Sequence, residues 1–158
     1  MNEPEQTPIT GQEDRKGLTA PIRALSEFYE AFNSRDLEKM AANWAATDDI
    51  IVMANPVGGI KRGWEEIRAV YQGIFSSPAQ VWVEFHDYTL HQAPEIFYAV
   101  GRERGEFRRG DTILKLAIRT TRLYRLLAGH WRQVHHHGSF DDPELLARYQ
   151  EAVRTAKR

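Results

Sequence analysis

Hydrophobic residues follow two different periods along the chain. Between residues 19 and 75 most of them recur every three or four positions, which is typical of amphipathic helices. Between residues 81 and 139 they mostly alternate with polar residues, which is typical of strands with one buried face. Helices followed by a run of strands predict an α+β fold.

Three helices are expected in the first half of the chain and one at its end. Thr19 and Asp36 are suitable N-terminal caps for the first two helices. The third is expected from about residue 63 to 75, and Asp142-Pro143 opens the last. A β-branched run over residues 50–54, followed by a turn rich in Pro and Gly, predicts one short strand.

Four longer strands are expected over residues 81–91, 95–107, 112–126 and 130–139. Their short connections predict antiparallel hairpins in a meander. We expect a curved antiparallel sheet with the N-terminal helices packed over its concave face, so that the domain is a cone with a pocket inside. Residues 1–17 are polar and have no periodic pattern, so we predict a flexible tail before a single domain over residues 18–158.

The composition excludes several classes of protein. The formal net charge of the 158 residues is −1, whereas a nucleic-acid-binding protein normally carries a strong basic excess. The chain has no cysteine, which excludes disulfides, thiolate zinc sites and cysteine nucleophiles. It also lacks an apolar run of membrane-spanning length and a signal-peptide core. We therefore expect a cytoplasmic protein with no nucleic-acid or membrane partner.

Arg122 breaks the alternation of its strand, because it falls on the apolar face. A charge at such a position must be paired, must reach water, or must face a cavity that holds a ligand.

Three consecutive histidines, His135 to His137, suggest a metal site at first sight. Neighbours on a strand face opposite ways, so only the first and third could share a metal ion, and no third ligand is indicated. We therefore predict no metal. His136 is expected to face the pocket, either as a hydrogen-bonded lining residue or, as a weaker candidate, as a general base.

The order of helices and strands, with WRQVHHHGS on the last strand, resembles the nuclear transport factor 2-like superfamily and its SnoaL-like members over about residues 18–139. The final hairpin is similar to the association domain of calcium/calmodulin-dependent kinase II, through Thr121-Arg122 and the residues from Gly129 to Ser139. That resemblance implies a pocket lined by arginines. Arg122 and Arg102 match two of the three positions, and the third is Gly138, which implies a less basic and roomier pocket.

Two interpretations of this arginine pair follow. Arg102 and Arg122 could clamp a carboxylate or another anion, which guanidinium groups hold in bidentate geometry. Alternatively, they are structural arginines bonded to backbone carbonyls or to a buried carboxylate, for which Glu84 and Glu103 are possible partners. With the remaining candidates, the predicted ligand-binding residues are Arg102, Arg122, His136, Asn55, Tyr98 and Trp64. Asn55 could instead hold the turn, and Trp64 could belong to the core with one edge on the pocket.

The segment NPVGG also resembles the Asp-Pro-x-Gly segment of ketosteroid isomerase, but without the catalytic residues. The general base of that family falls on Asn55, and an amide does not accept a proton at neutral pH. Its oxyanion-binding Tyr falls near Phe28, which has no hydroxyl, and no acid occurs around Ile118 and Thr120 for the second oxyanion donor.

Three functions remain open at this point. The first is a small-molecule-binding domain with an interior pocket for an anion or another small ligand. The second is an isomerase, cyclase or hydrolase that needs no cofactor and acts on a small hydrophobic substrate. The third is an oligomerisation module. In this fold the outer face of the sheet tends to be covered by a second copy, and Trp82 and Trp131 are spare aromatics for such a contact, so we expect a homodimer.

Overall fold

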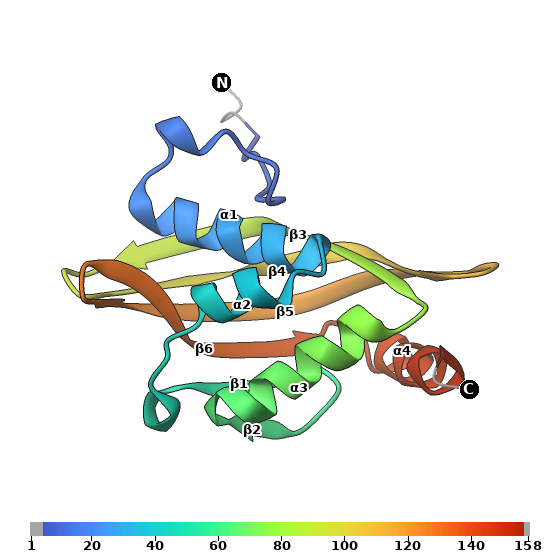
Figure 1. Cartoon of the computed structure of the whole chain (residues 1–158). Helices are drawn as coiled ribbons and strands as arrows, with labels where there is room; N and C mark the ends of the chain where they lie inside the picture. The colour runs from blue at the N-terminus through green and yellow to red at the C-terminus, as the bar shows by residue number, and fades with distance from the viewer. Residues whose placement is uncertain (1–4, 157–158) are drawn as a thin grey trace.

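Six strands form a single sheet in the order β2-β1-β6-β5-β4-β3 (Figure 1). The computed structural model describes residues 5–156. Its strands are β1 (Val52–Ala54), β2 (Ile60–Arg62), β3 (Gln80–Gln92), β4 (Ile96–Arg109), β5 (Thr112–Leu127) and β6 (His130–Phe140). The four long strands lie close to the predicted ranges and form the predicted antiparallel meander. The sequence did not indicate β2, nor that β1 pairs in parallel with β6.

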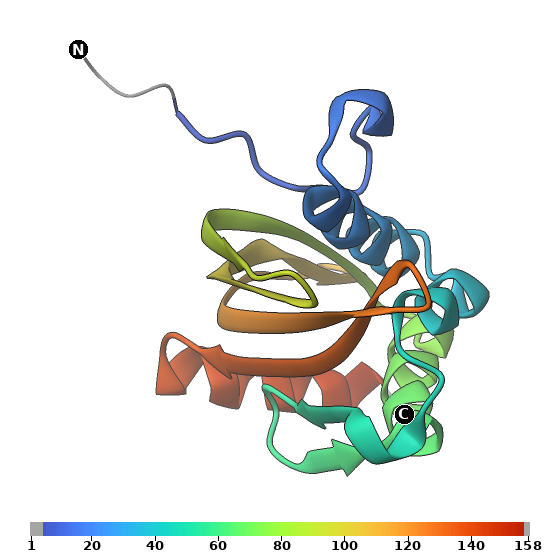
Figure 2. The same ribbon diagram turned by 90° about the vertical axis from the view of Figure 1, so that its left-hand side faces the viewer.

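Residues 5–156 form four α-helices, as predicted. They are α1 (Ala20–Asn33), α2 (Leu37–Asn43), α3 (Gly63–Ser76) and α4 (Pro143–Ala156), and two short 3₁₀ helices, Arg15–Gly17 and Asp48–Ile50, complete the order. The side chain of Asp36 caps α2 by accepting from the Lys39 N–H at 3.0 Å. Thr19 precedes α1 as expected, but its side chain makes no capping bond. The predicted α+β fold with a curved sheet is confirmed (Figure 2).

Strand alternation divides the sheet into an inner face, which contacts α1, and an outer face. On the inner face Arg122 of β5 lies between Ala99 of β4 and His136 of β6. One residue further along β5, Leu123 lies on the outer face between Tyr98 and His135. Where the alternation is regular, a shift of one position along a strand moves a side chain from the inner face to the outer face.

A β-bulge interrupts this alternation between β5 and β6. The pairing changes from Leu123 with His135 to Tyr124 with Gln133, which leaves Val134 with no residue opposite it. As a result, both Gln133 and Val134 are buried. The bulge therefore turns one more polar side chain, that of Gln133, towards the core.

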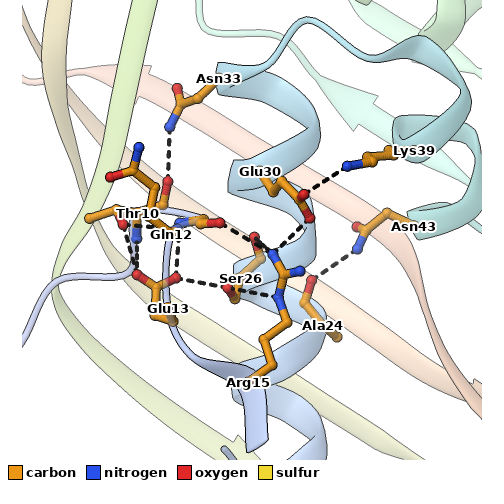
Figure 3. Close-up of polar contacts among 11 residues, drawn as sticks. Thr10, Gln12, Glu13, Arg15, Ala24, Ser26, Glu30, Asn33, Lys39 and Asn43 are labelled. Carbon is orange, nitrogen blue, oxygen red and sulfur yellow. Dashed lines mark hydrogen bonds and ion pairs between the residues drawn. The ribbon is translucent and has the colours of Figure 1, made fainter.

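The segment before α1 is bound to the domain, although the sequence predicted a flexible tail. Ile9 is 2% exposed, and its backbone exchanges two hydrogen bonds of 3.0 and 2.9 Å with Phe85 at the edge of the sheet. Glu13 accepts from the Ser26 hydroxyl at 2.8 Å, and Arg15 lies 2.8 Å from the Glu30 carboxylate (Figure 3). The prediction is therefore wrong for residues 9–15, because one apolar side chain and several polar bonds fix a segment that has no periodicity. Residues 1–4 of the predicted tail lie outside the described residues.

Within residues 5–156, no helix is both long and apolar enough to cross a membrane.

Candidate ligand-binding cavity

A cavity of about 620 Å³ lies between the inner face of the sheet and the helices α1, α3 and α4. A volume in this range suits a small organic molecule. Apolar side chains from each of these elements form much of its wall, including Phe28, Val70, Leu116, Ile118, Tyr149 and Val153. The polar side chains among the lining residues therefore decide what the cavity can recognise.

Arg122 is one of these polar lining residues, and it is only 2% exposed. Its Nη2 donates to Glu103 Oε1 at 2.6 Å, and its Nη1 donates to Gln133 Oε1 at 2.8 Å. Its Nε lies 3.4 Å from the hydroxyl of Tyr29, which itself donates to Glu103 Oε1 at 2.9 Å. The guanidinium also stacks over the ring of Phe28, with Cζ 3.5 Å from the ring centroid.

These contacts keep the Arg122 guanidinium protonated, and the Glu103 carboxylate balances its positive charge. Burial alone lowers the pKa of the guanidinium, but the Tyr29 and Glu103 oxygens outweigh it and raise the pKa above its ordinary value. Each of its three nitrogens already has a protein partner. Arg122 is therefore a buried structural cation, held by a carboxylate that also lines the cavity.

The predicted anion clamp does not form, because Arg102 faces the other side of the sheet. In the strand register, Arg102 lies opposite Arg119 of β5, and both residues are on the outer face. Nη1 of Arg102 lies 2.7 Å from the Asp87 carboxylate. The Arg102 side chain is 43% exposed. Since Arg102 and Glu103 are consecutive on β4, only Glu103 points inward. The alternative interpretation, a buried arginine bonded to Glu103, describes Arg122.

His136 lies beside Arg122 on the inner face and lines the cavity, as predicted. It is 6% exposed, and neither of its ring nitrogens has a hydrogen-bond partner among the described residues. Burial, followed by the positive charge of Arg122, lowers the pKa of the imidazole well below 6.5. The ring is therefore neutral at neutral pH, and it offers one donor and one acceptor.

Tyr71 supplies a further polar group from α3, on the wall opposite the sheet. Its hydroxyl is buried and has no partner with good hydrogen-bond geometry in the described part of the chain, although Trp44 and Arg122 lie close enough to lower its pKa. Burial raises the pKa of Tyr71 to about 12, so that the hydroxyl stays protonated and can donate. Sequence periodicity assigned Tyr71 to the core, and only the unpartnered hydroxyl in the structure distinguishes it from a packing residue.

Comparisons with known proteins agree with this architecture. The family model described as a SnoaL-like domain matches residues 22–143. The chain belongs to the SnoaL-like family. The predicted resemblance is thereby confirmed, and no match is found among curated proteins.

Solved structures similar to this SnoaL-like chain include a candidate dehydratase of the nuclear transport factor 2-like family from Streptomyces avermitilis. It is 16% identical with a TM-score of 0.70, and the match covers 77% of this chain and 93% of that one. A candidate calcium/calmodulin-dependent protein kinase type II association domain from Thiobacillus denitrificans is 26% identical with a TM-score of 0.67, over 79% and 98%. A ketosteroid isomerase-like protein from Erwinia carotovora atroseptica is 20% identical with a TM-score of 0.65, over 81% and 98%.

Gly138 does not enlarge the cavity of this SnoaL-like chain, although its match to an arginine position implied a roomier pocket. A Cβ at Gly138 would lie 2.6 Å from Pro56 Cγ and 3.2 Å from His136 Nε2. The proline of the β1–β2 turn therefore occupies the space that a side chain at Gly138 would need. The glycine allows this turn and the His136 ring to approach the sheet closely.

Of the three remaining predicted ligand-binding residues, Asn55, Trp64 and Tyr98, only Asn55 lines the cavity. Asn55 lines the cavity, while its Oδ1 accepts from the Val57 N–H at 3.0 Å and so also holds the turn. Trp64 is partly buried against the core and is not among the residues that line the cavity. Tyr98 is 41% exposed on the outer face, where it stacks on His91, so its predicted place in the pocket is wrong.

The described range 5–156 contains no group of three or more His, Asp or Glu side chains arranged to hold a metal ion. His135 and His137 lie on the outer face, with ring centroids 6.4 Å apart. Nδ1 of His135 is hydrogen-bonded to the carbonyl of Val52 at 2.8 Å.

Proposed function

We propose that this SnoaL-like domain binds a small, neutral and mostly apolar molecule in its interior cavity, and that His136 hydrogen-bonds the polar group of that molecule. The proposal is carried by the lack of hydrogen-bond partners, in the described part of the chain, at the imidazole ring of His136. Both of its nitrogens are enclosed at the cavity wall and have no partner in residues 5–156, so the proposal includes a rotation of the imidazole that turns one nitrogen towards the ligand. Unpaired buried polar groups are costly, and a bound molecule with one polar group removes that cost for one of the two nitrogens.

The charges around the cavity favour a neutral ligand over the anion considered from the sequence. Glu103 cancels the charge of Arg122 and itself lines the cavity. A carboxylate ligand would have to displace Glu103 from Arg122 or lie beside a second carboxylate. Either arrangement is unfavourable away from bulk water.

We also propose that the domain is a homodimer that pairs through the outer face of the sheet. Ile96, Tyr98 and Val100 of β4 are exposed large apolar side chains. A second copy is the partner that closed symmetry favours for such a face. Two of the similar solved structures are candidate association domains.

An enzyme that needs no cofactor is the second candidate function. It is favoured by the presence of a carboxylate, Glu103, and a neutral imidazole, His136, on one cavity wall. Binding without turnover is preferred, because an imidazole whose pKa lies well below 6.5 is a weak proton acceptor.

Thermal melting tests the proposed binding. Menthol, menthone and decanol serve as neutral probes, and decanoate serves as the anionic probe. A ligand at a hundred times its dissociation constant adds about 2.7 kcal/mol of stability, which is about 5–10 °C for a domain of this size. We expect shifts of this size from at least one neutral probe and none from decanoate.

Two matched variants locate the site. His136→Phe removes both inner nitrogens, and His137→Phe makes the same change one position along, on the outer face. We expect about tenfold weaker binding to His136→Phe and unchanged binding to His137→Phe. A response to decanoate alone, or equal binding by the two variants, contradicts the proposed function.

A further inference from the structure

The two carboxylate oxygens of Glu103 have different surroundings. Oε1 accepts both from Arg122 and from the Tyr29 hydroxyl. Oε2 has no partner in the described part of the chain, and it is not one of the fully enclosed polar atoms. Glu103 lines the cavity with a side chain that is 7% exposed, and its second oxygen is the one left available to that space. One oxygen therefore holds the ion pair, and the other is presented to whatever fills the cavity.

An ionised oxygen in this position can only accept hydrogen bonds. Its strand neighbour on the inner face, Ile118, is apolar and offers no donor. A donor supplied by the ligand would form a charge-assisted bond, which is stronger than a bond between neutral groups. A carbonyl or ether oxygen in the same place has no hydrogen to donate, and its lone pairs would be repelled by the carboxylate.

The nearby arginine decides between the possible donors. An ammonium group would be attracted by Glu103 but repelled by Arg122, whose Nη2 lies 2.6 Å from Oε1, and it would also lose its hydration. A hydroxyl group carries a donor without a charge. It can therefore bond to Oε2 and leave the charge balance of the pair unchanged.

We propose that the cavity selects alcohols: neutral, apolar molecules with a hydroxyl group that donates to Glu103 Oε2. This inference rests on the proposed binding function and names the ligand class for the same cavity. Glu103 is its specificity-determining residue, because its free oxygen distinguishes a hydroxyl from a carbonyl on the same carbon skeleton.

The test compares alcohol and ketone pairs of one skeleton, menthol with menthone and 2-decanol with 2-decanone, by calorimetric titration of the wild-type protein. We expect each alcohol to bind at least tenfold more tightly than its ketone. Glu103→Gln should reduce this ratio to about threefold or less. Glu106→Gln, which changes an exposed carboxylate on the same strand, should leave the ratio unchanged.

The outcomes separate this inference from the proposed function. Equal binding of alcohol and ketone to the wild type, or tighter binding of the ketone, overturns the alcohol preference and leaves neutral-ligand binding intact. If no member of either pair binds, the proposed function fails and the preference fails with it. The wild-type ratio needs no variant, so the test holds even if Glu103→Gln does not fold.

Discussion

Replacement of Arg122 by Met is expected to lower the free energy of unfolding by about 3–5 kcal/mol, the range found when one partner of a buried ion pair is removed. The change leaves Glu103 as a buried carboxylate whose described partner is the Tyr29 hydroxyl, and it removes the donor to Gln133. Urea unfolding of the variant beside the wild type measures this loss through the midpoint and slope of the transition.

Arg102→Met is the matched control, since it removes an arginine of the same sheet from the outer face. Its ion pairs are exposed, so the expected loss is below about 1 kcal/mol. The double variant Arg122→Met/Glu103→Gln should recover most of the stability, because the amide carries no charge and can still accept from Tyr29. Equal losses for the two single variants contradict the description of Arg122 as a buried, paired cation.

Acidification below pH 6.5 is expected to destabilise the protein through His136. Its pKa is well below 6.5 in the folded state and about 6.5 in the unfolded chain, so below pH 6.5 the unfolded state binds one more proton. The contribution of His136 to stability is therefore complete above pH 6.5. It falls by roughly 1 kcal/mol per pH unit as the pH drops towards the folded-state pKa.

Urea unfolding between pH 7.5 and 5 checks this slope, as the difference between the wild type and His136→Phe. In His136→Phe, the pH dependence of the free energy of unfolding should fall by the contribution of about one proton. If His136→Phe and the wild type have parallel pH profiles, the ring is not a buried neutral group.

The fold could be predicted from the sequence because both of its periodicities are strong. Helical spacing marked the first three helices, and alternation marked the four long strands to within about two residues at each end. The sequence also singled out Arg122, since a charge on an apolar strand face needs a partner or a cavity, and the structure gives it a partner within a cavity wall.

The error at Arg102 has a different origin. Apolar residues occupy both faces of β4, with Phe97 and Ala99 inside and Tyr98 and Val100 outside. Alternation alone could not decide which face is inner, and Arg102 was placed in the pocket by resemblance. In the structure, Glu103 occupies the inner position instead.

Two other features leave no periodic signal in the sequence. The bulge opposite Leu123 and Tyr124 turns Gln133 inward, and a bulge is one extra residue that alternation does not reveal. Ile9 is a single apolar residue in a polar segment, so nothing in the pattern indicated its burial beside Phe85.

The central claim is that a neutral ligand binds at the unpartnered ring of His136, and imidazole NMR tests it most directly. Protein labelled with ¹⁵N in its histidines is examined with and without menthol at pH 7. We predict a neutral ring for His136 and a change in its nitrogen shifts on addition of menthol, with His135 and His137 unaffected. A change confined to the histidines of the outer face, with His136 unmoved, would contradict the account.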